Sequence, residues 1–115
     1  MSVHRLDEYL RHILQAIERV EGYTCDLSRE DFMVNGLVQD AVLRNIEVVG
    51  EASHKIELLF PEFAAAHPEL PLRSAYQMRN SVSHGYLDVD LLIVWNTAKA
   101  DLPDFGSAVK ELLEK

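Results

Sequence analysis

The sequence lacks the cysteine pairs, long apolar runs and ligand-binding motifs that characterise disulfide-bonded, membrane-spanning and cofactor-binding proteins. It contains one cysteine, Cys25, so no disulfide can form within the chain, and the absence of a signal peptide favours a reducing cytoplasm. No apolar run approaches the roughly 20 residues that a helix needs to cross a membrane. The sequence has no glycine-rich phosphate loop and no Cys/His cluster with zinc-binding spacing. We therefore expect no metal, no cofactor and no membrane association.

Basic residues are also fewer than acidic ones. The sequence has 11 Lys and Arg residues and 19 Asp and Glu residues, which gives a net charge of −8. Because non-specific binding to nucleic acid needs a basic surface, this balance argues against a broad nucleic-acid interface. It is compatible with a small basic cleft around Arg79 and Arg73, and also with a basic partner.

Apolar residues, in contrast, are plentiful and recur at helical spacing. They make up 48% of the 115 residues, which is enough for one domain over residues 1–115 with a single core. The spacing of three and four, without the alternation of strands, predicts an all-α, up-and-down bundle of four to five helices. The expected helices cover residues 3–22, 36–60, 72–83, 89–100 and 105–114, with a short turn at 29–33 and a loop or frayed turn at 62–69.

Polar residues and a proline set the expected helix ends. Ser28 and Asp31 resemble a capping box for the short turn, and Asn35 is expected to cap the second long helix. Asp88 is expected to cap the fourth helix. The sequence Leu102-Pro103-Asp104 is expected to break the chain before the last helix, because proline interrupts helical hydrogen bonding.

The chemically capable residues are concentrated in one segment, Arg79 to Tyr86. Arg79 can fork onto two phosphate oxygens, and His84 can exchange a proton near neutral pH. Asn80 and His84 are four residues apart and share a helix face, whereas Arg79 and His84 are roughly 140° apart on an ideal helix. Either the helix ends before Gly85, or Arg79 reaches round it, or a second subunit completes the site.

The second long helix carries charged residues that bear on this segment. Arg44, Glu47 and Glu51 lie along one flank, where they can form a solvated ladder of ion pairs. Alternatively, the carboxylate of Glu47 or Glu51 orients the side chain of Arg79 or His84 without itself contacting a substrate. Gly50 in the same helix costs about 1 kcal/mol relative to alanine, which predicts that another backbone approaches closely there.

The order Arg-Asn-x-x-x-His-x-Tyr over residues 79–86 resembles the Arg-x4-His-x-Tyr motif of HepT-like toxins in the HEPN superfamily. The resemblance extends from about Val3 to about Leu113. One departure is Leu72 after Pro71, where the family often has Trp, and we interpret that position as packing. Other segments that fit the family are residues 44–52, 88–90 and 101–103.

The resemblance implies a metal-independent endoribonuclease that is the toxin of a toxin–antitoxin pair. In such a HEPN-like homodimer, His84 is the general acid/base, Arg79 stabilises the phosphorane, and Asn80 holds the His or a phosphate oxygen. Ser83 is a supporting candidate beside them. The implied partners are RNA and a nucleotidyltransferase-fold antitoxin of the MntA type, which attaches AMP to Tyr86 and silences the nuclease.

Two other interpretations stand beside this one. HEPN proteins also act as non-catalytic subunits, in which case Arg79, Asn80 and His84 bind a nucleotide or the nucleotidyltransferase partner; the acidic net charge slightly favours this. The chain can also be a purely structural helical module. RNA cleavage in the presence of EDTA, and its loss without His84, separates an enzyme from a binding subunit.

Overall fold

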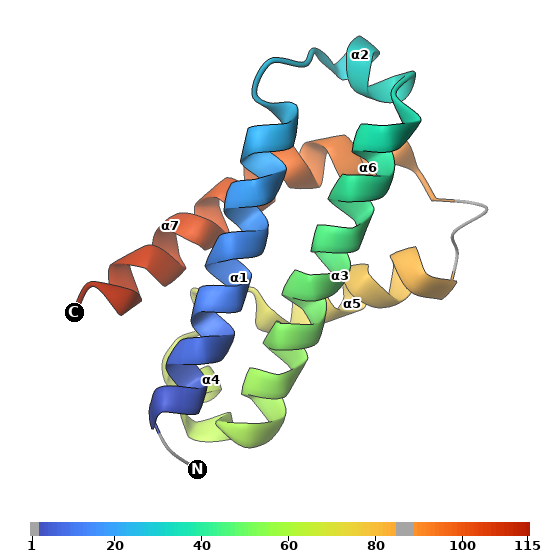
Figure 1. Cartoon of the computed structure of the whole chain (residues 1–115). Coiled ribbons are helices and arrows are strands. Elements are labelled where there is room, and N and C mark those ends of the chain that lie inside the picture. The colour runs from blue at the N-terminus through green and yellow to red at the C-terminus, as the bar shows by residue number, and fades with distance from the viewer. Residues whose placement is uncertain (1–2, 85–88) are drawn as a thin grey trace.

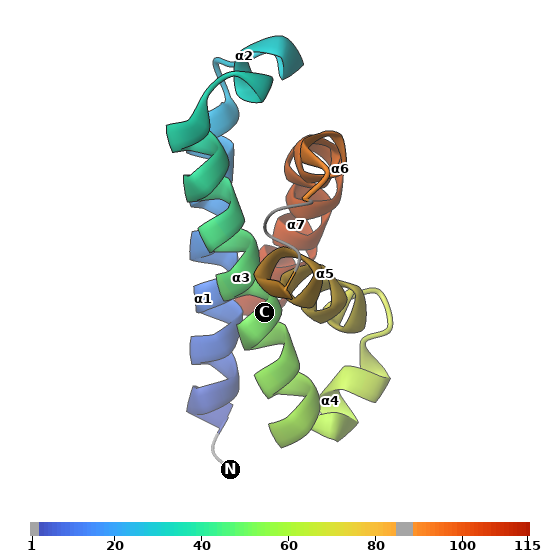
Figure 2. The same cartoon turned by 90° about the vertical axis from the view of Figure 1, so that its right-hand side faces the viewer.

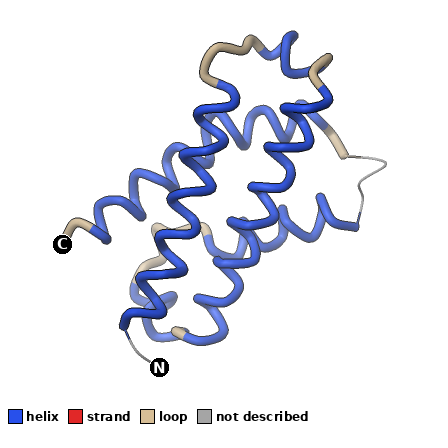
Figure 3. Tube along the Cα trace, in the orientation of Figure 1, coloured by secondary structure: helices blue, strands red, loops and turns tan. Residues whose placement is uncertain are grey.

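Helices make up almost all of the structure, a computed structural model that describes residues 3–84 and 89–115. Within these ranges there is no strand, and no helix is both long and apolar enough to cross a membrane (Figure 3). The expected all-α bundle is confirmed. The elements are α1 (Val3–Thr24), α2 (Arg29–Met33), α3 (Gly36–Leu59), α4 (Pro61–Ala66), α5 (Leu72–His84), α6 (Leu91–Asn96), the π-helical turn η1 (Thr97–Asp101) and α7 (Leu102–Leu113).

The two longest helices, α1 and α3, form the frame of the bundle. They run side by side in opposite directions (Figure 1). Helix α5 packs against α3, and α7 packs against α1, on the same side of the pair (Figure 2). The short helix α2 contacts α6 at one end of the molecule. The site segment at the end of α5 is therefore held against the middle of α3.

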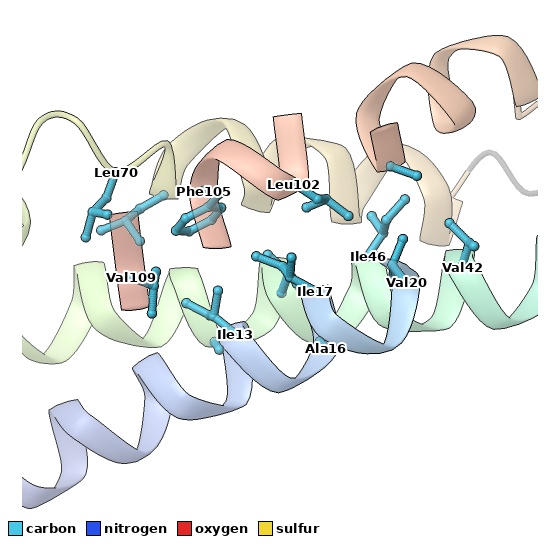
Figure 4. Close-up of a cluster of buried hydrophobic side chains, with 14 of the residues drawn as sticks. Ile13, Ala16, Ile17, Val20, Val42, Ile46, Leu70, Leu102, Phe105 and Val109 are labelled. Carbon is cyan, nitrogen blue, oxygen red and sulfur yellow. The ribbon is translucent and has the colours of Figure 1, made fainter. Parts of the chain in front are cut away.

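The core lies between the α1–α3 pair and the helices packed on it. Apolar side chains every three or four residues place one face of each helix inside, as Figure 4 shows for α1, α3 and α7. Each fully buried Ile, Leu or Phe contributes roughly 1.5–3 kcal/mol relative to an exposed one. Core residues on these helices include Leu10, Ile13, Ile17, Val20, Val42, Ile46, Val49, Ile56, Phe105 and Val109.

Two of the expected helix caps are confirmed. Ser28 and Asp31 form a reciprocal capping box, in which the Ser28 hydroxyl accepts the Asp31 N–H at 3.0 Å and the Asp31 carboxylate accepts the Ser28 N–H at 3.1 Å. The Asn35 side chain accepts the N–H of Val38 at 3.1 Å and starts α3. Both caps are local in sequence, so they need no tertiary contact to form.

The start of α6 differs from the expectation. Its cap is Asp90, whose carboxylate accepts the N–H of Leu92 at 2.9 Å. The expected helix start at Val89 is therefore wrong, and the expected cap Asp88 lies outside the described residues.

The segment after α3 is more regular than expected. Residues 61–66 form α4, with Pro61 at its first position, where a residue without an N–H is tolerated. The N–H of Phe60 bonds to the Ile56 carbonyl at 2.8 Å and closes α3 just before it. The loop expected at 62–69 is thus confined to the residues after Ala66.

The expected break at residues 102–104 is wrong, because α6 continues through η1 into α7. In η1 the N–H of Leu102 bonds to the carbonyl of Thr97, five residues back. Pro103, which has no N–H to donate, follows directly after this wider turn, where the spacing of an α-helix would bring its ring against the carbonyl four residues back.

Helix α1 ends against this π-helical turn. Lys99 in η1 donates to the carbonyl of Thr24 at 3.4 Å, and its ammonium lies 5.2 Å from the centre of the Trp95 ring. The Trp95 ring in turn packs against Phe32 of α2, with 5.3 Å between ring centres. A cation at the C-terminus of a helix is favourable because the helix dipole is negative there.

Candidate active site

The motif predicted from the sequence occupies the last two turns of α5. Arg79, Asn80, Ser83 and His84 all lie on this one helix, which ends at His84. A cation is favoured at this end by the helix dipole. The predicted modification site Tyr86 lies outside the described residues.

Arg79 is held in place by its neighbours. Its side chain is 29% exposed, and one guanidinium nitrogen lies 3.4 Å from a carboxylate oxygen of Glu51. The other terminal nitrogen donates to the side-chain oxygen of Asn80 at 3.0 Å. The guanidinium is thus oriented by two side chains and still reaches the surface.

Gly50 is the reason why Arg79 can lie so close to α3. A Cβ at this position would collide with the Cβ of Arg79 and would lie 2.7 Å from the carbonyl oxygen of Ala75. The close backbone approach predicted from the mid-helix glycine is confirmed, and the approaching backbone is that of α5.

The two glutamates singled out in the sequence both face α5. Glu51 pairs with Arg79, and Glu47, one turn earlier, accepts a hydrogen bond from the Ser83 hydroxyl at 2.8 Å. Among the described residues no ion pair joins Arg44 to Glu47 or Glu51, so the surface ladder does not form. The part these carboxylates play in catalysis stays a prediction.

His84 is exposed at the end of α5. Within residues 3–84 and 89–115, no hydrogen bond or ion pair joins it to Arg79 or to Asn80, and the Asn80 oxygen is occupied by Arg79. The helix continues through both Arg79 and His84, which keeps the two side chains on different faces. One copy of the chain therefore does not bring the two predicted catalytic groups together.

A groove runs along α3 beside the motif. A hollow of about 440 Å³ lies between α1, α3 and α5, and an adjoining hollow of about 320 Å³ shares Arg44 and Glu47 with it. We call the two together the α3 groove. Its first part is lined by Tyr9, His12, Arg44, Glu47, Val48, Glu51, Ala52, Lys55 and Arg79, and its second by Asp40, Leu43, Arg44, Glu47, Val82 and Ser83.

Arg73 does not contribute to this groove, contrary to the expectation from the sequence. It lies six residues before Arg79, which on a helix turns it roughly 240° away. Its guanidinium is exposed and lies 3.4 Å from a carboxylate oxygen of Glu57.

Comparison with known proteins identifies the family. A family model described as "Ribonuclease HepT-like" matches residues 13–112, which is most of the chain. The chain belongs to the HepT-like ribonuclease family. No solved structure matches it significantly.

Several relatives of this HepT-like chain have names that refer to ribonucleases. "Probable ribonuclease HepT" of Thermococcus cleftensis is 37% identical over 105 residues, covering 91% of this chain and 93% of the relative. A "Putative RNase" of Caldanaerobacter subterraneus subsp. tengcongensis is 36% identical and is covered to 93%. In a "Gamma-glutamylcyclotransferase and putative RNase" of Methanocaldococcus jannaschii, 35% identical, the match covers 93% of this chain but 47% of the relative.

The sequence predicts a packing role for Leu72 in this HepT-like chain. Leu72 is buried at the start of α5, in agreement with that interpretation. Within the described residues, no group of three or more His, Cys, Asp or Glu side chains is placed to hold a metal ion.

Several residues of the groove in this HepT-like chain were not predicted from the sequence, among them Tyr9, His12, Asp40 and Lys55. Lys55 follows Glu51 by four positions, so extending the charged flank of α3 by one turn would have found it. Tyr9 and His12 lie on α1, and only the packing of α1 on α3 brings them to the groove.

Proposed function

We propose that this protein is a metal-independent endoribonuclease and the toxin of a toxin–antitoxin pair. The observation that carries the proposal is the exposed end of α5. There Arg79 is oriented by Glu51 and Asn80, and His84 faces solvent, in a chain of the HepT-like family. The ribonuclease names of its relatives support the same activity.

In the proposed reaction the 2′-oxygen of a ribose attacks the adjacent phosphorus. A histidine acting as general base takes the 2′-hydroxyl proton, and a proton is delivered to the 5′-oxygen as its bond to phosphorus breaks. His84 is the residue proposed for this proton transfer. Arg79 stabilises the negative charge that develops on the phosphorane oxygens. The products carry a 2′,3′-cyclic phosphate and a 5′-hydroxyl.

The separation of Arg79 and His84 within one chain favours a site made by two copies. Arg79 points towards Glu51 on α3, whereas His84 lies at the exposed end of α5. In a homodimer with the two α5 ends facing each other, His84 of one subunit can meet the Arg79 region of the other. This arrangement is part of the proposal and supplies both groups to one phosphate.

The proposed regulation rests on the resemblance at Tyr86. An antitoxin with a nucleotidyltransferase fold would transfer AMP from ATP to the Tyr86 hydroxyl, releasing pyrophosphate. The added phosphate carries a negative charge close to the Arg79 segment and competes with the scissile phosphate. Both proteins would act in the cytoplasm.

The direct test is cleavage of RNA by the purified protein in the presence of EDTA. We expect cleavage without metal, products with a cyclic phosphate, and loss of activity in His84→Ala. His67→Ala is the matched control, since His67 is paired with Glu69 at 3.0 Å in the loop after α4, away from the motif. Full activity of His84→Ala, or an absolute requirement for a divalent metal, would contradict the mechanism.

The alternative is a non-catalytic subunit that binds a nucleotide or a nucleotidyltransferase. Two observations favour it: the net charge of −8, and the lack of contact between His84 and Arg79 in the described structure. In the same assay this alternative predicts binding of nucleotide or partner with no cleavage under any condition.

A further inference from the structure

The α3 groove differs in charge from the rest of the protein. Acidic residues outnumber basic ones by 19 to 11 over the chain; the smaller hollow adds one acidic residue, Asp40, but the larger hollow is lined by three cations and two carboxylates. Both carboxylates already have donors: Glu47 accepts from Ser83, and Glu51 pairs with Arg79. Arg79 compensates the charge of Glu51, whereas the Ser83 hydroxyl is neutral and leaves the charge of Glu47 in place, so an anion in the groove would depend on the remaining cations.

Two of the three cations, Arg44 and Lys55, are available to a ligand. Both side chains are exposed, and no ion pair within the described ranges engages either of them. The third, Arg79, is the predicted catalytic arginine. A free guanidinium and a free ammonium beside it are what the phosphates of an RNA strand require.

The α1 wall of the groove offers an aromatic surface. Tyr9 lines the groove and is half-buried, and its hydroxyl accepts a hydrogen bond from Arg5 at 3.1 Å. The Arg5 guanidinium also lies 6.0 Å from the centre of the Tyr9 ring. An aromatic ring is a typical platform for an unpaired base, because stacking does not depend on base identity.

The groove also runs beside part of the motif. Its smaller hollow ends at Ser83, the neighbour of His84, and its larger hollow contains Arg79. Arg44 and Lys55 are eleven residues apart on α3, which corresponds to about 16 Å along the helix axis. A strand of a few nucleotides lying in the groove would therefore pass Arg79, and His84, which lines neither hollow, would come from the second subunit of the proposed dimer.

We propose that the α3 groove binds the RNA strand that flanks the cleaved bond, with Arg44 and Lys55 on backbone phosphates and Tyr9 stacked on a base. The proposal rests on the proposed ribonuclease function and adds to it a substrate-binding surface. It requires single-stranded RNA, because stacking on Tyr9 needs a base that is not paired.

Binding is tested with a short, fluorescently labelled single-stranded RNA that carries 2′-O-methyl groups and so cannot be cleaved. We expect Arg44→Ala and Lys55→Ala each to weaken binding about three- to tenfold at low salt. Each should also reduce the salt dependence of the affinity by a slope of ~0.7, as expected for one lost phosphate contact. Tyr9→Leu should weaken binding, and Tyr9→Phe should restore it because the ring is kept.

Arg19→Ala and Lys110→Ala are the matched controls. Both residues are exposed cations outside the groove, so each control removes the same charge as its test variant. We expect both controls to bind like the wild type, and all variants to keep the far-UV circular dichroism and melting temperature of the wild type. In cleavage assays with longer RNA, the groove variants should show a raised KM relative to these controls.

The outcomes separate this proposal from the proposed function. If the wild type cleaves RNA and Arg44→Ala and Lys55→Ala bind it as tightly as the controls do, the groove proposal is overturned and the ribonuclease function stands. If the wild type binds the RNA through the groove but never cleaves, the ribonuclease function fails and the groove stands. Loss of the dimer in the Arg44 and Lys55 variants would show that the groove is a subunit contact, and no RNA binding by the wild type would overturn both proposals.

Discussion

Replacing Gly50 by alanine is the sharpest test of how Arg79 is positioned. The new Cβ would collide with the Cβ of Arg79 and would lie 2.7 Å from the carbonyl oxygen of Ala75. Neither atom is the far end of a flexible side chain, so α3 and α5 must move apart. The change therefore acts on the packing that holds the guanidinium in place.

The expected loss of stability follows from two opposing terms. Overpacking a tight contact costs about 1–3 kcal/mol, and a contact with backbone belongs at the upper end of that range. Alanine in place of glycine inside a helix returns about 1 kcal/mol. The net loss is thus about 2 kcal/mol, which for a chain of 115 residues lowers the melting temperature by about 8 °C.

The measurement is urea and thermal unfolding, followed by RNA cleavage well below the melting temperature. Gly22→Ala is the control, because nothing lies within 4 Å of the Cβ that it would add near the end of α1. We expect the control to be as stable as the wild type or more so, and Gly50→Ala to lose activity about tenfold or more through displacement of Arg79. A Gly50→Ala protein that is as stable and active as the wild type would refute the idea that this contact positions Arg79.

Three further predictions concern the site and its assembly. Glu51→Gln should lower kcat about tenfold or more with little change in the free energy of unfolding, because a half-exposed ion pair contributes less than about 1 kcal/mol; a raised kcat would mean that Glu51 competes with the phosphate for Arg79. Light scattering should give a mass near twice 13.1 kDa, and a monomer that still cleaves RNA would exclude the shared site. Intact-mass spectrometry after incubation with the antitoxin and ATP should show added AMP on the wild type, whereas Tyr86→Phe should stay toxic and unmodified. Equal modification of Tyr86→Phe would place the acceptor elsewhere.

Features that depend on neighbouring residues could be predicted from the sequence. The caps at Asn35 and at Ser28 with Asp31 involve partners three residues away, so their side chains specify the helix starts directly. The close approach at Gly50 could be predicted because glycine destabilises the middle of a helix and is expected there only where it is needed. In the structure, the backbone of α5 lies against it. The positions of Arg79 and Glu51 on facing helices follow from the same contact.

Features that depend on packing could not be predicted. The helix through Pro103 looks interrupted in the sequence, because only the folded chain shows that a wider turn removes the clash with the proline ring. The groove wall at Tyr9 and His12 is equally invisible, since nothing in α1 indicates which part of α3 it will cover. The hydrogen bond from Ser83 to Glu47 joins residues 36 positions apart and depends on the same packing.

The π-helical turn η1 has a consequence for how the chain tolerates insertions and deletions. Each residue of an α-helix turns the chain by about 100°. One extra residue in a regular helix therefore rotates all later side chains by that angle relative to the core. Val94 of α6 and Phe105 and Val109 of α7 are all buried with η1 between them. A π-helical turn takes in about one residue more than an α-helical turn, so removing one residue from η1 would restore an ordinary helix with α6 and α7 facing nearly as before. The wide turn, more than the composition of this short segment, keeps the two halves of the last helix in phase with the core.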